Sequence, residues 1–220
     1  MLYTDPIILS LASAWRPLLE IICLDLEGVI IPEIWINVAE KTGINALRDT
    51  TRDIPDYNEL MLQRLRIMNE NNLGLPIIQE VISSLEPLDG ALAFLDDLRK
   101  NFQVVILSDT FYEFAKPFME KLGWPTLFCH RLESDSDGKI TNYHLRMVDH
   151  KREAVKAFHS LNYTVYAAGD SYNDTSMLAE ADHGFLFMAP ENVIKEFPHF
   201  AAIQTYDELQ YQFESISSRF

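Results

Sequence analysis

Two hydrophobic patterns alternate along the chain. Short apolar runs with the length of buried parallel strands occur at residues 21–26, 104–107, 165–168 and 185–188. The segments between them place apolar residues at helical spacing, as in residues 91–98 and 111–122, where Gly123 follows as a helix stop. This alternation of strands and helices predicts an α/β fold built on a doubly wound parallel sheet.

One stretch, from residue 33 to residue 85, interrupts the alternation because its apolar spacing is helical throughout. It contains a helix ending near Gly43, a second helix around residues 60–68, and a third with Pro76 at its start. This insert follows the first strand directly, near the sheet edge where α/β proteins bind ligands. We therefore predict a helical cap, with an ordinary run of packing helices as the alternative.

The domain boundaries follow from that insert. We expect a core of residues 21–32 and 86–220, a cap of residues 33–85, and an N-terminal extension of residues 1–20. No basic residue precedes the apolar part of the extension, which disfavours a secretory signal. Within the core, Asp137-Gly138 lies between two β-like runs, residues 131–133 and 139–145, and predicts a small hairpin.

Composition and charge narrow the classes of function. With 18 Lys and Arg against 33 Asp and Glu, the net charge of −15 disfavours a nucleic-acid partner. No run approaches the roughly 18 consecutive apolar residues of a membrane span. Cys23 and Cys129 each lie in an apolar run, which predicts buried, reduced thiols in a cytoplasmic protein. The histidines show no ligand-like spacing, so no His-based second metal site is predicted among His130, His144, His150, His159, His183 and His199.

Two carboxylates end the first apolar run, in the order Asp25-Leu26-Glu27-Gly28-Val29. Residues two apart in a strand point the same way, and Gly28 permits a sharp turn. One carboxylate can attack phosphorus while the other transfers protons. The alternative is a solvated strand end, and this motif alone does not decide between them.

Two further segments offer groups that bind phosphate. Ser108-Asp109-Thr110 is expected at a strand-to-helix turn, where a hydroxyl and helix N–H groups can hold a phosphate oxygen. The alternative role for this motif is helix capping. Lys151 can supply the cation that a transferred phosphoryl group requires. A solvated lysine is the alternative, with Arg152 as its neighbouring competitor.

The segment from Gly169 to Asp174 follows another apolar run and places Asp170 at the end of a strand. Mg²⁺ prefers oxygen ligands and takes one or two carboxylates beside substrate phosphate, so Asp25 and Asp170 can hold it together. Asn173 and Asp174 are expected both to cap the next helix and to serve the site. The convergence of the four segments on one sheet edge carries the inference of phosphoryl transfer.

In this order the four segments resemble the four motifs of the haloacid dehalogenase superfamily, and the insert resembles the cap of its phosphoserine phosphatase type. The resemblance covers essentially all of the chain from residue 21 onward. It implies a Rossmann-like core with a small all-helical cap, and Mg²⁺ as the cofactor. It also implies hydrolysis of O-phospho-L-serine through an aspartyl phosphate, with homoserine as a further phosphoryl acceptor.

The same resemblance implies a role for each residue. Asp25 is then the nucleophile and a Mg²⁺ ligand. Glu27 is the general acid and base, with its backbone carbonyl on the metal. Asp170 completes the metal site, and Asp174 supports it from behind. The residues expected to bind substrate around the phosphoryl group are Ser108, Asp109, Lys151 and Asn173.

From the cap, the resemblance implies that Glu33 binds the substrate ammonium and that Arg64 binds its carboxylate. The pair also makes chemical sense alone, because a zwitterionic phospho-amino acid needs one anion and one cation, and a guanidinium grips a carboxylate with two hydrogen bonds. The alternatives are a favourable charge at a helix start for Glu33 and a solvated helix face for Arg64.

Two residues depart from the family pattern, since ordinary phosphoserine phosphatases carry Asp where Glu27 stands and Gly where Asp109 stands. Glu27 is one methylene longer, which can misplace the attacking water and let an alcohol such as homoserine intercept the phosphoaspartate. The rival functions are a phosphatase of the same superfamily for a nucleotide or sugar phosphate, a signalling receiver, and an inactive binding protein of the same fold.

Overall fold

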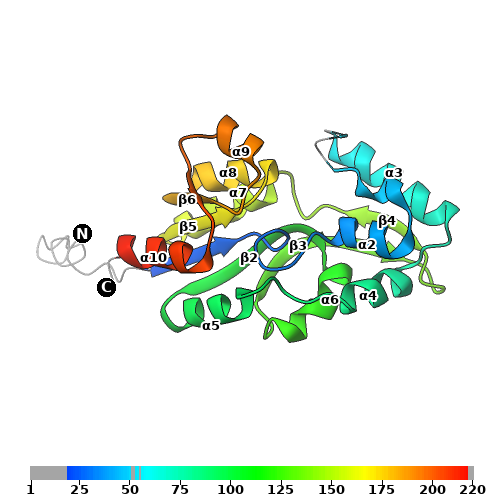
Figure 1. Cartoon of the computed structure of the whole chain (residues 1–220), viewed down its shortest axis with the longest axis horizontal. Coiled ribbons are helices and arrows are strands. Elements are labelled where there is room, and N and C mark those ends of the chain that lie inside the picture. Colours follow the sequence, from blue (N-terminus) through cyan, green and yellow to red (C-terminus); the bar gives the residue numbers. More distant parts are fainter. Residues whose placement is uncertain (1–18, 51–52, 55, 218–220) are drawn as a thin grey trace, which may run out of the picture.

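A mostly parallel sheet organises the chain, for which the computed structural model describes residues 19–50, 53–54 and 56–217. The strand order is β4-β3-β2-β1-β5-β6-β7, and only β4 runs antiparallel to its neighbour (Figure 1). The strands are β1 (Leu19–Leu24), β2 (Gln103–Phe111), β3 (Thr126–Ser134), β4 (Ile140–His144), β5 (Tyr163–Gly169), β6 (His183–Phe187) and β7 (Ala201–Ile203). The prediction of a doubly wound α/β fold is confirmed.

Helices cover both faces of this sheet (Figure 1). One layer contains α5 (Ala91–Asn101), α6 (Tyr112–Lys121) and α10 (Tyr206–Ile216), and the other contains α7 (His150–Ser160), α8 (Thr175–Glu180) and α9 (Glu191–Glu196). Alternate residues of β1 enter the two hydrophobic cores: Ile22 and Leu24 enter one, and Ile21 and Cys23 enter the other. Burial on both faces explains the near-continuous apolar character of the central strands.

The insert after β1 is helical over its described residues. It forms α2 (Ile34–Thr42), a short 3₁₀ helix (Asn45–Arg48), α3 (Tyr57–Glu70) and α4 (Leu75–Ser83). These helices gather at the end of the molecule away from α10 (Figure 1). Trp35 of α2 meets the ring of Phe114 of α6 edge-on, with 5.3 Å between centroids. The insert therefore shares one hydrophobic core with the α5–α6 face of the sheet.

Several local expectations are confirmed, and others need correction. Gly43 ends α2 in the left-handed conformation, and the predicted hairpin forms between β3 and β4. Ser108-Asp109-Thr110 was expected at a turn but lies inside β2, because the strand resumes pairing with β3 at Phe111 after a bulge. Strand β1 begins at Leu19 rather than at residue 21. Most of the predicted N-terminal extension, residues 1–18, lies outside the described residues.

Two further predictions concern the cysteines and membrane-spanning segments. Both cysteines are buried free thiols, as expected, and burial raises the pKa of each well above its ordinary value. Within the described ranges, no helix combines the length and the apolar character that crossing a membrane requires.

Candidate active site

Asp25 lies immediately after β1, where its backbone N–H still bonds the carbonyl of Ala168 in β5 at 3.0 Å. The side chain is 6% exposed, and its Oδ1 accepts the Leu26 N–H at 2.7 Å. Burial, followed by repulsion from Asp174, raises the pKa of Asp25 well above its usual range, although the Lys151 ammonium opposes this shift. The carboxylate therefore lies in a site that favours an added positive charge.

Gly28 shapes the turn that follows Asp25. Its φ of +74° is unfavourable for other residues, and a β-carbon there would lie 2.4 Å from Oδ2 of Asp170. The loops after β1 and β5 can therefore approach each other only because residue 28 has no side chain. This close approach brings Asp25 and Asp170 to the same edge of the sheet.

Glu27 points from this turn toward the start of α2. Its Oε2 accepts the N–H of Ile34 at 2.8 Å and so satisfies a donor in the first turn of α2. A hydrogen bond from the Thr110 side chain reaches the same carboxyl. Burial, with repulsion from Glu33, nevertheless raises the pKa of Glu27 to about 8. Glu27 is therefore largely protonated at neutral pH, which suits a general acid.

Lys151 lies in the first turn of α7 and is 3% exposed. Its Nζ lies 2.9 Å from Asp25 Oδ1, 2.7 Å from Asp174 Oδ1 and 3.2 Å from Asp109 Oδ2. Arg152, the competitor named from the sequence, points outward and pairs with Glu180. The structure therefore identifies Lys151 as the cation beside Asp25.

Asp174 is fully buried, and both of its oxygens contact donors within the protein. Oδ1 accepts from Lys151, while Oδ2 accepts the Ser171 N–H at 3.0 Å and the Ser171 hydroxyl at 3.1 Å. Asp170 lies nearer the opening, and burial with repulsion from Asp174 raises its pKa to about 7. These contacts suit Asp174 to orienting Lys151 and leave Asp170 better placed to hold a cation.

Glu33 and Arg64 reach the same region from the helical insert after β1. Glu33 is the residue before the first turn of α2, and Arg64 lies on α3 with 6% of its surface exposed. The Arg64 guanidinium lies over the Trp35 ring, 4.5 Å from the centroid, and donates from Nη2 to the Asp49 carbonyl at 2.8 Å. Its Nε is buried without a hydrogen-bond partner among the described residues. That unpartnered N–H can donate a hydrogen bond to a ligand's carboxylate.

A hollow of about 170 Å³ joins these groups. Every residue predicted from the sequence to be catalytic, to contact substrate or to ligate metal lines it, namely Asp25, Glu27, Glu33, Arg64, Ser108, Asp109, Lys151, Asp170 and Asn173. Asp174 lies behind this lining, as its predicted supporting role requires. The arrangement places carboxylates, a hydroxyl and two cations around a space suited to a small phosphorylated molecule.

Comparison with known proteins agrees with this geometry. A sequence model of the haloacid dehalogenase-like hydrolases matches residues 19–182. The chain belongs to the haloacid dehalogenase-like hydrolases. Among its relatives, phosphoserine phosphatase ThrH of Pseudomonas aeruginosa is 63% identical over 201 residues, covering 91% of this chain and 98% of that protein. A phosphoserine phosphatase of Pseudomonas syringae pv. tomato is 60% identical over 214 residues, covering 97% of this chain and 90% of that protein.

Solved structures show the same fold. A phospho-aspartyl intermediate analogue of a phosphoserine phosphatase superposes on this hydrolase with a TM-score of 0.73, at 20% identity over 90% of this chain and 99% of that one. A substrate-bound phosphoserine phosphatase complex gives a TM-score of 0.71 at 19% identity, over 89% and 98% of the two chains. At these identities the likeness concerns the architecture alone.

The donor set of this hydrolase fits a hard divalent cation. Asp25, Asp170 and Asp174 each present a carboxylate oxygen within 4.8 Å of the other two. Mg²⁺ binds through one or two carboxylates together with water and phosphate oxygens. Because Asp174 is occupied by Lys151 and Ser171, the pair Asp25 and Asp170 is the better match to Mg²⁺.

Sequence reasoning missed several residues of the site. Trp35 stacks on Arg64, Thr110 bonds Glu27, and the Tyr57 hydroxyl donates to the Asp109 carbonyl at 3.2 Å. Thr110 was visible as the last residue of its motif, and Tyr57 lies two helical turns before Arg64 on one face of α3. The histidine spacing gave no sign that His130 and His150 meet at Asp109.

Proposed function

We propose that the protein is a Mg²⁺-dependent phosphomonoesterase that hydrolyses O-phospho-L-serine to L-serine and phosphate. The observation that carries the proposal is the shared hollow. Asp25 and Lys151, which suit phosphoryl transfer, line it together with the anionic Glu33 and the cationic Arg64 of the helical insert. Phosphoserine has the matching phosphoryl, ammonium and carboxylate groups. Two relatives at 60% identity or more bear the name phosphoserine phosphatase, which supports the same substrate.

In this proposal the cap, residues 33–85, recognises the amino-acid part of the substrate. Glu33 faces the ammonium, and Arg64 offers its unsatisfied Nε to the carboxylate. Burial lowers the pKa of Arg64 to about 10, so the guanidinium is still charged at neutral pH. A buried, charged donor stacked on Trp35 is held in place before the substrate arrives, which reduces the entropy cost of binding.

The first chemical step is attack by Asp25 on phosphorus. Lys151 and Leu26 both contact Oδ1, so Oδ2 is the oxygen that forms the new bond. The bond from phosphorus to the seryl oxygen breaks, and that oxygen takes a proton from Glu27. Lys151, with Ser108 and Asn173 at the wall of the hollow, offsets the negative charge of the phosphoryl oxygens.

The second step reverses the role of Glu27. Its carboxylate takes a proton from water, and the water oxygen attacks phosphorus. The bond from phosphorus to Asp25 breaks, which restores the Asp25 carboxylate and frees inorganic phosphate. A pKa of about 8 lets one carboxyl group donate in the first step and accept in the second. The hydrogen bonds from Ile34 and Thr110 hold the group in place for both steps.

Mg²⁺ completes the site. We propose Asp25, Asp170 and the Glu27 carbonyl as its protein ligands, in agreement with the carboxylate donor set and with the raised pKa values of Asp25 and Asp170. When bound, the ion neutralises phosphoryl charge and orients the group for attack. The two buried, free cysteines agree with a reducing cytoplasm as the place of the reaction.

Transfer to homoserine is a second proposed outcome of the same intermediate. Ile34 N–H and Thr110 hold Glu27 toward the cap, which favours an acceptor bound there over a free water. A Glu27→Asp variant tests the idea by shortening the side chain by one methylene. We expect a larger share of water attack when hydrolysis and phosphohomoserine formation are measured together. Equal partitioning in both proteins would remove the explanation.

The decisive experiment is phosphate release from a panel of phosphomonoesters with Mg²⁺ present. We expect phosphoserine to give the highest kcat/KM, well above nucleotide and sugar phosphates. Preference for a nucleotide or sugar phosphate would instead support a related phosphatase. A stable aspartyl phosphate without turnover would support a receiver, and no phosphorylation at all would support a binding protein.

A further inference from the structure

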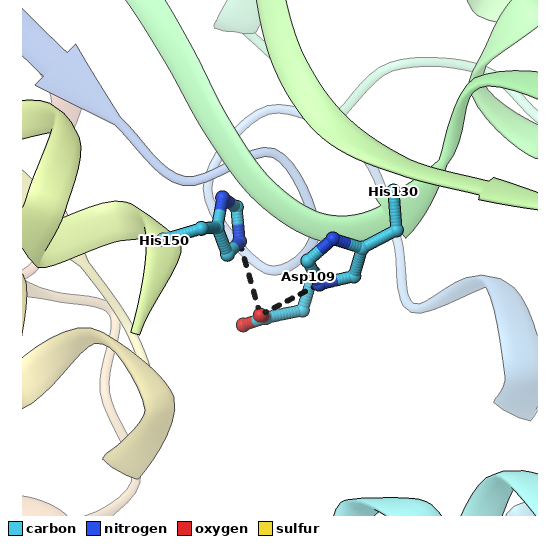
Figure 2. A group of neighbouring side chains, drawn as sticks. All are labelled: Asp109, His130 and His150. Atoms are coloured by element: carbon cyan, nitrogen blue, oxygen red, sulfur yellow. Dashed lines mark hydrogen bonds and ion pairs between the residues drawn. The ribbon is translucent and has the colours of Figure 1, made fainter. Parts of the chain in front are cut away.

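The Asp109 carboxylate lies between two histidines from separate elements, His130 of β3 and His150 of α7 (Figure 2). Its Oδ1 lies 3.1 Å from His150 Nε2 and 3.6 Å from His130 Nε2. Its Oδ2 lies 3.2 Å from Lys151 Nζ. Both histidines are 3% exposed, so solvent does not screen their contacts with Asp109. The two oxygens of one carboxylate thus face two different partners, a histidine pair and the active-site lysine.

The position of the proton on the His130 ring shows whether these side chains are arranged to bind a metal or to contact one another. Its Nδ1 accepts the backbone N–H of Arg146 at 3.1 Å, so the proton of the neutral ring is on Nε2 and points at Asp109. A metal ligand needs the opposite arrangement, with the Nε2 lone pair on the metal and an N–H at Nδ1. The adjacent Lys151 ammonium also repels a cation. The cluster is therefore a network of polar contacts on Asp109, with a hydrogen bond to His150 at 3.1 Å and a longer contact to His130 at 3.6 Å.

The network keeps Asp109 negatively charged. Burial by itself would raise the pKa of Asp109, but Lys151 and the N–H groups of His130 and His150 outweigh it and hold that pKa well below the usual range. An anion at this point repels a phosphoryl group. The part in substrate binding expected for Asp109 must therefore be exerted through Lys151.

We propose that His130 and His150 are positioning residues that act through Asp109, holding its Oδ1 so that its Oδ2 anchors the Lys151 ammonium at the phosphoryl site. Lys151 has a long flexible stem and three carboxylate partners, Asp25, Asp174 and Asp109. Without a fixed Asp109, the ammonium settles between the other two and is withdrawn toward the nucleophile. The proposal rests on the role of Lys151 under the proposed function.

Asp109 also connects this network to the rest of the site. The hollow around Asp25 and a neighbouring one of about 290 Å³ share Tyr57, Asp109, Lys151 and Asn173 in their walls. The Tyr57 hydroxyl holds the Asp109 backbone carbonyl from the cap. A displaced Asp109 would therefore disturb the wall of the phosphoryl site as well as the lysine.

Paired substitutions of His150 test the proposal. His150→Gln keeps an N–H donor in the place of Nε2, whereas His150→Leu removes it. Loss of one hydrogen bond to a charged group should lower kcat/KM for phosphoserine by about 10- to 100-fold in the Leu variant. The Gln variant should remain within about threefold of wild type, because the donor is kept. The matched control is His159→Leu, which breaks a 3.0 Å pair with Asp182 at the other end of α7 and should change nothing.

A second measurement does not depend on the amino-acid part of the substrate. Orthovanadate binding to the Mg²⁺-loaded protein, followed by calorimetry, reports on Lys151 and the phosphoryl site alone. We expect His150→Leu and His130→Leu to weaken orthovanadate binding. His150→Gln and His130→Gln should keep an affinity close to that of wild type. In an Asp109→Asn background, His150→Leu should weaken orthovanadate binding little further, because His150 acts on Lys151 only through the Asp109 carboxylate.

The outcomes separate the two proposals. Folded Leu variants with wild-type kcat, KM and orthovanadate affinity would overturn the positioning role, as would equal losses in the Gln and Leu variants. Stoichiometric Zn²⁺ binding that disappears in His130→Gln would overturn the hydrogen-bonded assignment. A wild-type protein that binds orthovanadate but leaves phosphoserine intact would overturn the proposed function while the positioning role stays measurable.

Discussion

Arg64 offers the sharpest test of the proposal that the helical insert recognises the amino-acid part of the substrate. We predict that Arg64→Gln removes recognition of the substrate carboxylate while leaving the phosphoryl site intact. The guanidinium is 6% exposed, stacked on Trp35, and has a buried Nε with no partner among the described residues. Glutamine keeps polarity and reach but loses the charge and the two-pronged geometry that a carboxylate requires.

The expected magnitude follows from the interaction that is lost. Hydrogen bonds to charged groups contribute about 1.5–3 kcal/mol net, which corresponds to a loss of roughly 10- to 150-fold in kcat/KM. The low exposure of Arg64 favours the upper part of this range, because little water is present to screen the pair. The pKa of about 10 leaves the wild-type group charged throughout an assay at neutral pH.

Two substrates isolate the carboxylate contact. O-phospho-L-serine and O-phosphoethanolamine share the phosphoryl group and the ammonium, and only phosphoserine has the carboxylate. We expect kcat/KM for phosphoserine to fall in Arg64→Gln while the low value for phosphoethanolamine stays nearly constant, so that the ratio between them collapses. Phosphate release under first-order conditions measures both values.

Arg66→Gln is the matched control, because Arg66 lies on the same helix with a 70% exposed side chain and only a 3.9 Å contact to Glu70. It should retain the wild-type substrate ratio. Equal losses for the two substrates in Arg64→Gln would show that the residue supports the fold of the cap instead of binding the carboxylate. An unchanged ratio in a well-folded variant would refute the reasoning outright.

Four other outcomes are expected. Asp25→Asn should abolish turnover while circular dichroism shows an intact fold; hydrolysis at the wild-type rate would refute the nucleophile. Chelation by EDTA should abolish phosphate release and added Mg²⁺ should restore it, whereas activity in excess chelator would exclude the metal. Phe114→Ala should lower the free energy of unfolding by about 3–5 kcal/mol in urea titrations, since its fully buried ring contacts Trp35 and Phe111; a smaller loss would show that the core collapses around the gap. Because the pKa of Asp109 is lowered in the folded state, its carboxylate stabilises the fold above the unfolded value of about 4 and loses that effect as pH falls. The stability gap between wild type and Asp109→Asn should therefore narrow from pH 7 to pH 3, and a constant gap would contradict the assigned shift.

Local pattern was sufficient for much of the fold. The apolar runs predicted four of the central parallel strands, and helical spacing with Gly43 and Pro76 located the helices of the insert. Strand ends were less well predicted, because pairing partners decide where a strand stops. Strand β2 continues through Ser108 and Asp109 to Phe111 only because β3 offers a further partner at His130.

The candidate site divides in the same way. Sequence alone determined the carboxylates, the lysine and their order, because parallel strands bring their carboxyl ends to one edge and the motifs follow those strands. Only the tertiary structure decided which partner each group meets: Glu27 at the start of α2, Trp35 on Arg64, and His130 with His150 on Asp109. These contacts join residues far apart in the chain, and the period of a strand or helix carries no information about such distant neighbours.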